Sequence, residues 1–520
     1  MKKALRLISF LCIIAMLITG CSGKTQTSGE NIDLSSYPID TDVTLTYLMP
    51  LRSALAGMID NYSETHFAQE AEKRTGVKVD YIHPAVGQES QMLSLLIASG
   101  ELPDIMWGDW YSYAEGIDAA IDSNIIIPLN DYKKYAPAYF GKLGEVKDWD
   151  IVAKTDNQNY YGFMALARPP IELTTGIALR ADWLEDLSLE RPETIDEWET
   201  VLAAFKDQKG ATAPFANKGL NQNLFAMFGC HFGPYIDDGE FRYDYVEPQR
   251  KVALQKLNEW FNKGWLDKNI VSADSKMIDT QLLTGKTGAA IITGGDMGRL
   301  TKASKDPNFR FAAAKYPTWN KGEFNESVVV SYPASPYQVA TISAQCKYPE
   351  LAVKYMDYFY TEEGGLFAAF GTEGVSYNMV DGEPIFSDLI MKNPDGLSAQ
   401  EALGLYAKAG AKGAFESDRR YRHQFYELDE QKEALDIWAM DYEASRPHRE
   451  VCLSFTPEEA EEVSSIKAEL DSYSSSMFAK FVTGQEPLEK FDSFVDTMYK
   501  YGVERMLEIY NTAYARYLKR

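Results

Sequence analysis

Asp42-Val43-Thr44-Leu45-Thr46-Tyr47-Leu48-Met49 opens the first regular pattern in this 520-residue chain. Apolar and polar residues alternate along most of it, which predicts a β-strand with one face more apolar than the other. A helical pattern over 63–74 follows, and residues 77–81 repeat the strand pattern. Another helical pattern, over 90–99, leads to a short buried strand near 102–106. Such alternation predicts a parallel sheet covered by helices on both faces.

A second set of strand and helix units begins near Tyr160. Thr194 and Glu197 form a capping box at the start of one helix, and Thr456 and Glu459 form another within a mainly helical last third. Two sets of units separated near residue 158 require two sheets, so the sequence predicts an α/β protein with two lobes. Further strands are predicted over 176–180, 288–292, 327–331 and 338–343.

The composition is typical of a soluble globular protein, with 45% apolar, 13% aromatic and 25% charged residues. Lys and Arg number 52 against 76 Asp and Glu, which gives a net charge of −24. This sign opposes phosphate backbones and anionic lipid headgroups, so nucleic acid is not an expected partner. It also disfavours polyanionic sugars, unless a local cluster of arginines reverses the potential.

The first twenty residues have the pattern of a secretory signal peptide. Three basic residues precede an apolar run over 7–18, which is too short to span a bilayer. Small residues then precede Cys21, which resembles the bacterial lipobox, in which the cysteine is diacylated and becomes the new N-terminus. We therefore predict a lipoprotein signal peptide over 1–20 and a flexible tether over 21–41. The alternative is an ordinary signal peptide with an incidental cysteine.

The other cysteines and the histidines form no recognisable metal pattern. Cys230, Cys346 and Cys452 are far apart and odd in number, so we predict buried thiols and no disulfide framework. Neither a Cys-x-x-Cys nor a His-Glu-x-x-His pattern occurs, so the sequence predicts no metal site and no cofactor.

Several short motifs occur in a fixed order along nearly the whole mature chain. They are Ala98-Ser99-Gly100-Glu101-Leu102-Pro103-Asp104-Ile105, Arg180-Ala181-Asp182-Trp183-Leu184, Arg191-Pro192-Glu193-Thr194-Ile195-Asp196-Glu197-Trp198, Asn262-Lys263-Gly264-Trp265-Leu266-Asp267, Thr361-Glu362-Glu363-Gly364 and Gly374-Val375-Ser376-Tyr377. Each motif alone is weak, but their order and spacing are specific. Through them the chain resembles the extracellular solute-binding lipoproteins, family 1, of bacterial ABC importers, in the large oligosaccharide-binding branch.

The resemblance implies a type II periplasmic-binding-protein fold, with two lobes, a crossover hinge and a helical C-terminal region. Lobe 1 is expected over 42–158 plus 330–395, and lobe 2 over 159–329 plus 396–520. The implied function is capture of a carbohydrate between the lobes and delivery to a two-subunit ABC permease with a cytoplasmic ATPase. The resemblance also implies a monomer that is no enzyme and that is held outside the cell membrane by its lipid.

One departure from the family concerns calcium. Some relatives that take up acidic oligosaccharides carry an Asp- and Asn-rich calcium loop after the helix that holds Trp198. The corresponding residues here, 205–213, contain Asp207 as their one carboxylate, whereas calcium requires several oxygen ligands. We predict no calcium at this position.

A sugar cleft needs aromatic platforms and polar groups beyond the ends of strands. Some candidate ligand-binding residues have an alternative role. It is core packing for Trp107 and Trp110, a plain turn for Asp296 and a surface ion pair for Arg168. Trp183, Trp198 and Trp265 are assigned to packing. The candidate ligand-binding residues are Trp107, Asp109, Trp110, Tyr111, Arg168, Asp296, Arg299 and Trp319.

Two other functions remain open from the sequence. An extracellular carbohydrate-active hydrolase would also be secreted and aromatic, and it would need two carboxylates flanking the scissile bond. No catalytic motif is present, but the many acidic residues leave such a pair open. A sensor lipoprotein would present its ligand to a membrane kinase instead of a permease.

Overall fold

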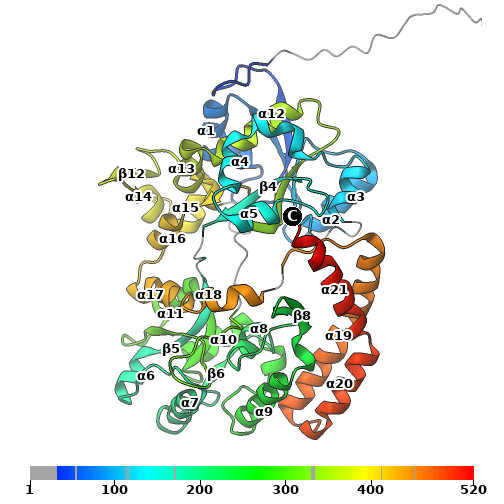
Figure 1. Cartoon of the computed structure of the whole chain (residues 1–520). Coiled ribbons are helices and arrows are strands. Elements are labelled where there is room, and N and C mark those ends of the chain that lie inside the picture. Colours follow the sequence, from blue (N-terminus) through cyan, green and yellow to red (C-terminus); the bar gives the residue numbers. More distant parts are fainter. Residues whose placement is uncertain are drawn as a thin grey trace, which may run out of the picture.

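A computed structural model describes most of the chain after the tether. The predicted signal peptide over 1–20 and Cys21 lie outside the described residues, as does most of the predicted tether. The described residues form two α/β lobes, each with its own buried core (Figure 1). The described ranges are 32–52, 55–111, 113, 116–168, 171, 173–328, 334–410, 413–449 and 451–520.

Lobe 1 is built on a six-stranded sheet in the order β14-β4-β11-β3-β1-β2. β1 is parallel to both β2 and β3, as the alternation of strands and helices predicted. β11 is antiparallel to both of its neighbours, because it enters the sheet on the chain's return from the other lobe. The strands are β1 (Thr44–Leu48), β2 (Lys78–Ile82), β3 (Ile105–Gly108), β4 (Phe163–Ala167), β11 (Ala334–Ile342) and β14 (Glu416–Ser417), with a separate hairpin of β12 (Tyr377–Val380) and β13 (Glu383–Phe386).

The first helix shows how the sequence sets element boundaries. The Thr65 hydroxyl accepts a hydrogen bond from the backbone N–H of Ala68, which caps the helix start. Gly76 ends the helix at φ 73°, and a Cβ there would lie 2.5 Å from the backbone nitrogen of Ile39. The helices of lobe 1 are α1 (His66–Thr75), α2 (Glu89–Ser99), α3 (Ile117–Asp122), α4 (Pro137–Leu143), α5 (Lys147–Val152), α12 (Pro349–Asp357), α13 (Glu362–Phe370), α14 (Asp388–Met391), α15 (Ala399–Tyr406) and α16 (Arg419–Phe425).

Lobe 2 contains a four-stranded sheet in the order β10-β5-β9-β6. β5 pairs with β9 and β10 in antiparallel fashion, and β6 is parallel to β9. Residues 327 and 328, part of a predicted strand, are not in one, and 329–331 lie outside the described residues. The strands are β5 (Thr175–Arg180), β6 (Phe215–Ala216), β9 (Ala289–Thr293) and β10 (Phe311–Ala314), with a hairpin of β7 (Pro234–Asp237) and β8 (Glu240–Tyr243).

Helices surround this sheet and form the C-terminal region at one side of lobe 2 (Figure 1). The capping boxes at Thr194 and Thr456 are both present, as predicted. No helix in the described part of the chain has the length and apolar content that a membrane crossing requires. The helices are α6 (Ala181–Asp186), α7 (Ile195–Lys209), α8 (Gln222–Ala226), α9 (Pro248–Asn262), α10 (Ser275–Leu283), α11 (Gly294–Ala303), α17 (Asp429–Trp438), α18 (Tyr442–Ser445), α19 (Pro457–Thr483), α20 (Phe491–Lys500) and α21 (Val503–Tyr517).

The chain crosses between the lobes later than the sequence predicted. β4 belongs to the first sheet because it pairs with β11, so the first crossing follows residue 167 and does not occur at 158. Leu403 and Phe415 are buried in the core of lobe 1, so the last crossing falls shortly before α17 and not near 396. The periodicity of α15 and α16 is the same in either lobe, and only their packing partners assign them to lobe 1.

The C-terminal helices also connect the two lobes. Asp156 of lobe 1 accepts hydrogen bonds from Arg516 Nε at 3.0 Å and from Arg520 Nε at 2.7 Å. The side chains of Asp156 and Arg520 are only 13% and 2% exposed, so this contact is largely shielded from water. The end of α21 therefore lies against lobe 1, as Figure 1 shows.

We expect Asp156→Ala to lower the free energy of unfolding by about 2 kcal/mol, because it leaves two guanidinium groups without their shared acceptor. Urea unfolding of the purified protein measures this loss. Glu462→Ala is the matched control, because it breaks an exposed pair with Arg505 on the same helices. An Asp156→Ala protein as stable as this control would contradict the connecting role of Asp156.

Candidate ligand-binding cleft

Three adjoining pockets lie between the lobes. The arginine pocket has a volume of about 490 Å³, the α11 pocket about 700 Å³ and the histidine pocket about 300 Å³. Arg52, Thr174, Ala409, Tyr421 and Arg422 line both of the first two pockets. Tyr337 lines both the arginine pocket and the histidine pocket. The three pockets therefore adjoin one another, and together they are called the cleft.

The strand ends of lobe 1 place the residues of the arginine pocket. Arg52 follows the carboxyl end of β1, and Arg168 directly follows β4. Arg419 and Arg422 lie on α16, which begins just after β14. These strands point the same way in the sheet, and the ligands of α/β proteins bind beyond the carboxyl ends of strands. β11 runs antiparallel to these strands, so its first half, which includes Gln338, lies at the same end of the sheet.

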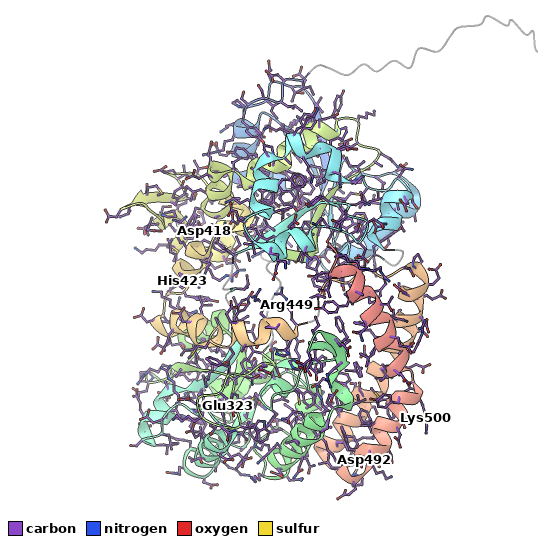
Figure 2. The ribbon with its side chains drawn as sticks, in the orientation of Figure 1. Glu323, Asp418, His423, Arg449, Asp492 and Lys500 are labelled. Carbon is purple, nitrogen blue, oxygen red and sulfur yellow. The ribbon has the colours of Figure 1, made fainter. Side chains whose placement is uncertain are left out.

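Lobe 2 presents the ends of two paired strands to the cleft. Thr175 of β5 is opposite Thr293 of β9, so the start of one strand lies beside the end of the other. Thr174 and Thr293 both line the α11 pocket, together with the first turns of α11. Figure 2 labels Arg449 in the opening between the lobes, where it lines the histidine pocket and donates to Asp148 of lobe 1 at 2.8 Å.

The arginines of the arginine pocket differ in their partners. Arg168 donates to Glu416 and Glu145, at 2.7 and 2.6 Å from its Nη2. Burial alone would lower the pKa of Arg168, but these two carboxylates raise it. Arg52 is partly buried, and its guanidinium has no ion pair or hydrogen-bond partner among the described residues. Burial lowers the pKa of Arg52, Tyr421 and Tyr62 act in the opposite direction, and the like charge of Arg422 makes a smaller lowering contribution.

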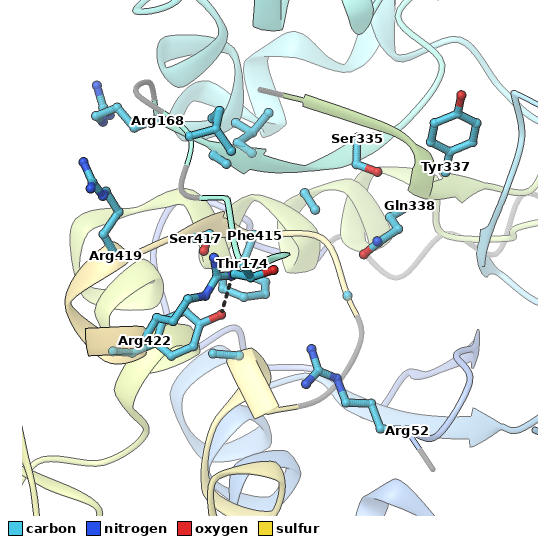
Figure 3. Close-up of a pocket in the computed structure, with 17 residues that line it drawn as sticks. Arg52, Arg168, Thr174, Ser335, Tyr337, Gln338, Phe415, Ser417, Arg419 and Arg422 are labelled. Carbon is cyan, nitrogen blue, oxygen red and sulfur yellow. Dashed lines mark hydrogen bonds between the residues drawn. The ribbon is translucent and has the colours of Figure 1, made fainter. Parts of the chain in front are cut away.

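Figure 3 shows how these side chains lie. Arg52, from the segment after β1, and Gln338, from β11, both point into the middle of the pocket. Arg422 lies across from them, with its Nη2 3.4 Å from the Tyr421 hydroxyl. Arg168 and Arg419 lie at the side of the pocket. The lining of the pocket thus combines cations, an amide and a phenol.

The histidine pocket carries a neutral imidazole. The ring of His231 stacks on Tyr235, with centroids 4.1 Å apart, and lies 5.6 Å from the ring of His448. Burial, with a smaller contribution from the neighbouring His448, lowers the pKa of His231 to about 3. A flat, neutral surface of this kind suits the apolar face of a sugar ring.

The first cluster of predicted ligand-binding residues lies outside the three pockets. Trp107 is 7% exposed and Trp110 is fully buried, so both belong to the core of lobe 1 and the packing alternative is correct. β3 lies in the interior of the sheet and contains Trp107, and all four of its residues are buried. Asp109 lines none of the three pockets. Tyr111 lines none either, but its ring packs edge-on against Tyr337, at 5.4 Å between centroids.

The α11 candidates do reach the cleft, although they have local roles. Asp296 accepts hydrogen bonds from Thr293 and completes the capping box of α11. Arg299 donates to both Asp279 and Asp296. Burial would raise the pKa of Asp296, but the hydrogen bonds from Arg299 and Thr293 lower it.

The glycines of α11 serve packing. A Cβ on Gly294 would lie 2.8 Å from the Tyr426 hydroxyl, and one on Gly298 would lie 2.6 Å from Nε2 of Gln431. The last crossing segment therefore packs directly against the helix backbone. Trp319 is 41% exposed and lines none of the three pockets.

The sequence analysis missed several residues that line the arginine pocket, namely Arg52, Tyr337, Gln338, Arg419, Tyr421 and Arg422. One signal was present. The run Arg419-Arg420-Tyr421-Arg422-His423 is strongly basic in an acidic chain, and Figure 2 labels His423 on the side of lobe 1 that faces lobe 2. Arg52 has no such signal, because a lone arginine after a strand is common.

Metal-binding chemistry is not apparent in the described ranges. Within them, no group of three or more His, Cys, Asp or Glu side chains is arranged to hold a metal ion. Cys230, Cys346 and Cys452 are free, buried thiols, as predicted.

Comparison with known proteins agrees with this architecture. The family model for the bacterial extracellular solute-binding protein matches residues 56–366. Lipoprotein LipO of Bacillus subtilis (strain 168) is 21% identical over 541 aligned positions, which cover 97% of each chain. The fructooligosaccharide ABC transporter substrate-binding protein FusA of Streptococcus pneumoniae serotype 4 is 27% identical, over 52% of this chain and 54% of FusA.

The fold is also found among solved structures. The crystal structure of the alginate-binding protein AlgQ2 without calcium ion superposes with a TM-score of 0.70 at 21% identity, over 92% of this chain and 99% of AlgQ2. The family match covers more than half of the chain and the two-lobe fold agrees with it, so the chain belongs to the bacterial extracellular solute-binding proteins, family 1.

Proposed function

We propose that this protein is the substrate-binding lipoprotein of an ABC importer, which captures an oligosaccharide between its lobes and delivers it to a membrane permease. The observation that carries the proposal is the cleft of three adjoining pockets, which share lining residues and take residues from both lobes. Each pocket, at about 490, 700 or 300 Å³, is in the volume range that holds a ligand of drug size, so three adjoining pockets suit an oligosaccharide better than a single sugar. The names of FusA and AlgQ2 describe binding of oligo- or polysaccharides by proteins of similar sequence or fold.

The side chains of the cleft suit carbohydrate chemistry. Tyr337, which is 41% exposed, offers a ring face where two of the pockets meet. Gln338, Ser335 and Thr174 offer hydroxyl and amide groups to sugar hydroxyls. Aromatic stacking with polar groups beside it is the combination that a sugar ring requires.

Capture depends on closure of the lobes. An open form binds the ligand on one lobe, and the closed form gains population only through the additional contacts that the other lobe makes. A shift from 1:99 to 99:1 requires about 5.5 kcal/mol of preference for the closed form. Several ring stacks at about 0.5–1.5 kcal/mol each, with hydrogen bonds, supply this amount.

The proposal places the protein outside the cytoplasm, attached through a diacylated Cys21. Two acyl chains anchor stably, at about 0.8 kcal/mol per buried methylene, whereas one chain is marginal. A monomer that closes on its ligand and docks on a two-subunit permease is sufficient for this role.

A hydrolase is less well supported, because Asp296 of the cleft is already held by Thr293 and Arg299.

A thermal-shift screen over a glycan panel tests the proposal. A ligand at 100 times its Kd should stabilise the protein by about 2.7 kcal/mol. We expect Tyr337→Ala to weaken such a ligand about 3- to 10-fold through loss of a ring stack. Tyr499→Ala on α20, where the side chain is 49% exposed against 41% for Tyr337, should leave binding unchanged. Failure of every glycan to stabilise the protein would contradict the proposal, and cleavage of a bound glycan at enzymatic rates would favour the hydrolase.

A further inference from the structure

The arginine pocket is basic although the protein as a whole is strongly acidic. Its described lining includes Arg52, Arg168, Arg419 and Arg422 and contains neither Asp nor Glu. The whole chain has 76 acidic residues against 52 basic ones. A pocket lined by charged residues in the proportions of the whole chain would carry a negative charge. The excess of arginine in the arginine pocket therefore requires a specific reason.

Arg52 stands apart from the buried arginines of the same protein. Arg180 is 4% exposed and pairs with Asp182, at 2.8 Å from its Nε. Arg250 is fully buried and pairs with Asp244, again at 2.8 Å from its Nε. Arg52 is partly buried beside the like charge of Arg422, and the described residues provide it with no carboxylate. Withdrawing a cation from water without a partner is unfavourable, so the position of Arg52 raises the free energy of the folded protein.

We propose that the ligand is an acidic oligosaccharide and that Arg52 binds one of its uronate carboxylates in the arginine pocket. The inference rests on the proposed function for the carbohydrate part of the ligand. A guanidinium presents a planar pair of donors that matches the two oxygens of a carboxylate, which gives both strength and orientation. The ligand anion then provides the partner that the protein itself does not.

The neighbouring groups suit a uronate ring in this position. Gln338 points into the same space as Arg52 and can bind ring hydroxyls, and the Tyr421 ring lines the same pocket (Figure 3). The two cations that line the α11 pocket but not the arginine pocket are already neutralised, since Arg299 pairs with Asp279 and Asp296, and Lys302 pairs with Glu427. The charged sugar residue therefore binds at Arg52, and the rest of the chain extends into the α11 pocket.

The test uses ligands that differ in charge alone. Uronic-acid oligosaccharides of several backbones are compared with their methyl esters, and binding is measured by calorimetry on the full mature protein. We expect at least one acid to bind, its methyl ester to bind about 10- to 100-fold more weakly, and Arg52→Gln to reduce binding of the acid by a similar factor while affecting the ester little. Arg505→Gln, on the exposed face of α21, is the control and should change neither.

Unfolding without ligand separates recognition from a structural role. Arg52→Gln should leave the melting temperature unchanged or higher, because it removes an unpaired charge, whereas loss of a structural arginine would lower it. Esters that bind as well as the acids, or an Arg52→Gln protein that weakens acid and ester equally, would overturn the inference. Binding of neutral glycans alone would overturn it and leave the proposed function intact, whereas binding of no glycan of either kind would reject the proposed function itself.

Discussion

Asp244→Ala is expected to lower the free energy of unfolding of lobe 2 by about 3–5 kcal/mol. The Asp244 carboxylate accepts hydrogen bonds from Nε and Nη2 of Arg250, and both side chains are almost completely buried. The Arg250 guanidinium also lies 3.9 Å from the ring centroid of Phe225, within the core of lobe 2. Removal of the carboxylate leaves a cation in an apolar environment, and water cannot reach it without disrupting the core.

Chemical unfolding followed by tryptophan fluorescence measures this loss. Asp492→Ala is the matched control, because Asp492 pairs with Lys251 on the same lobe but is 82% exposed, at the far end from the cleft (Figure 2). The control should unfold almost like the unaltered protein. The double variant Asp244→Leu with Arg250→Met should recover most of the stability, since it removes both charges together. A single variant no less stable than the control would show that the buried pair contributes nothing.

Gly176→Ala is expected to destabilise lobe 2 by about 3 kcal/mol. Gly176 lies in β5, and a Cβ there would be 2.5 Å from Cγ of Trp438 on α17. The indole packs directly on the strand and donates from Nε1 to the carbonyl of Ile177 at 3.0 Å. The added methyl group must displace the indole, which combines the cost of overpacking with the loss of that hydrogen bond.

The consequence of Gly176→Ala extends to ligand binding, because α17 is the first element after the last crossing between the lobes. We expect the variant to show both a lower melting temperature and weaker binding of any ligand found in the glycan screen. Gly141→Ala, on α4 of lobe 1, is the control, since a Cβ there meets nothing within 4 Å. Recovery of stability by adding Trp438→Phe would locate the effect at this contact. Equal stability of the Gly176 and Gly141 variants would contradict it.

Local elements were predictable wherever a short stretch of sequence contains the whole cause. The alternation over 42–49 predicted β1, and the capping boxes at Thr194 and Thr456 predicted two helix starts. Each of these signals depends on neighbours within a few residues. The sequence was less informative about packing partners. The sequence predicted Trp107 and Trp110 to follow a strand, as a ligand platform would, but Trp107 lies within β3 and both side chains are buried in the core of lobe 1.

The amino-acid sequence alone therefore determined the class of fold, the number of lobes and most helix and strand types, because hydrophobic periodicity and caps act over short distances. Only the tertiary structure decided where the chain crosses between the lobes and which residues face the cleft. Arg52 and Arg422 are distant in sequence. They line the same pocket because the carboxyl ends of β1 and β14 lie at the same end of one sheet. A site that is assembled from the ends of separate strands has no signature in any short stretch of sequence. Its charge can be recognised only when the positions of the strands in the sheet are known.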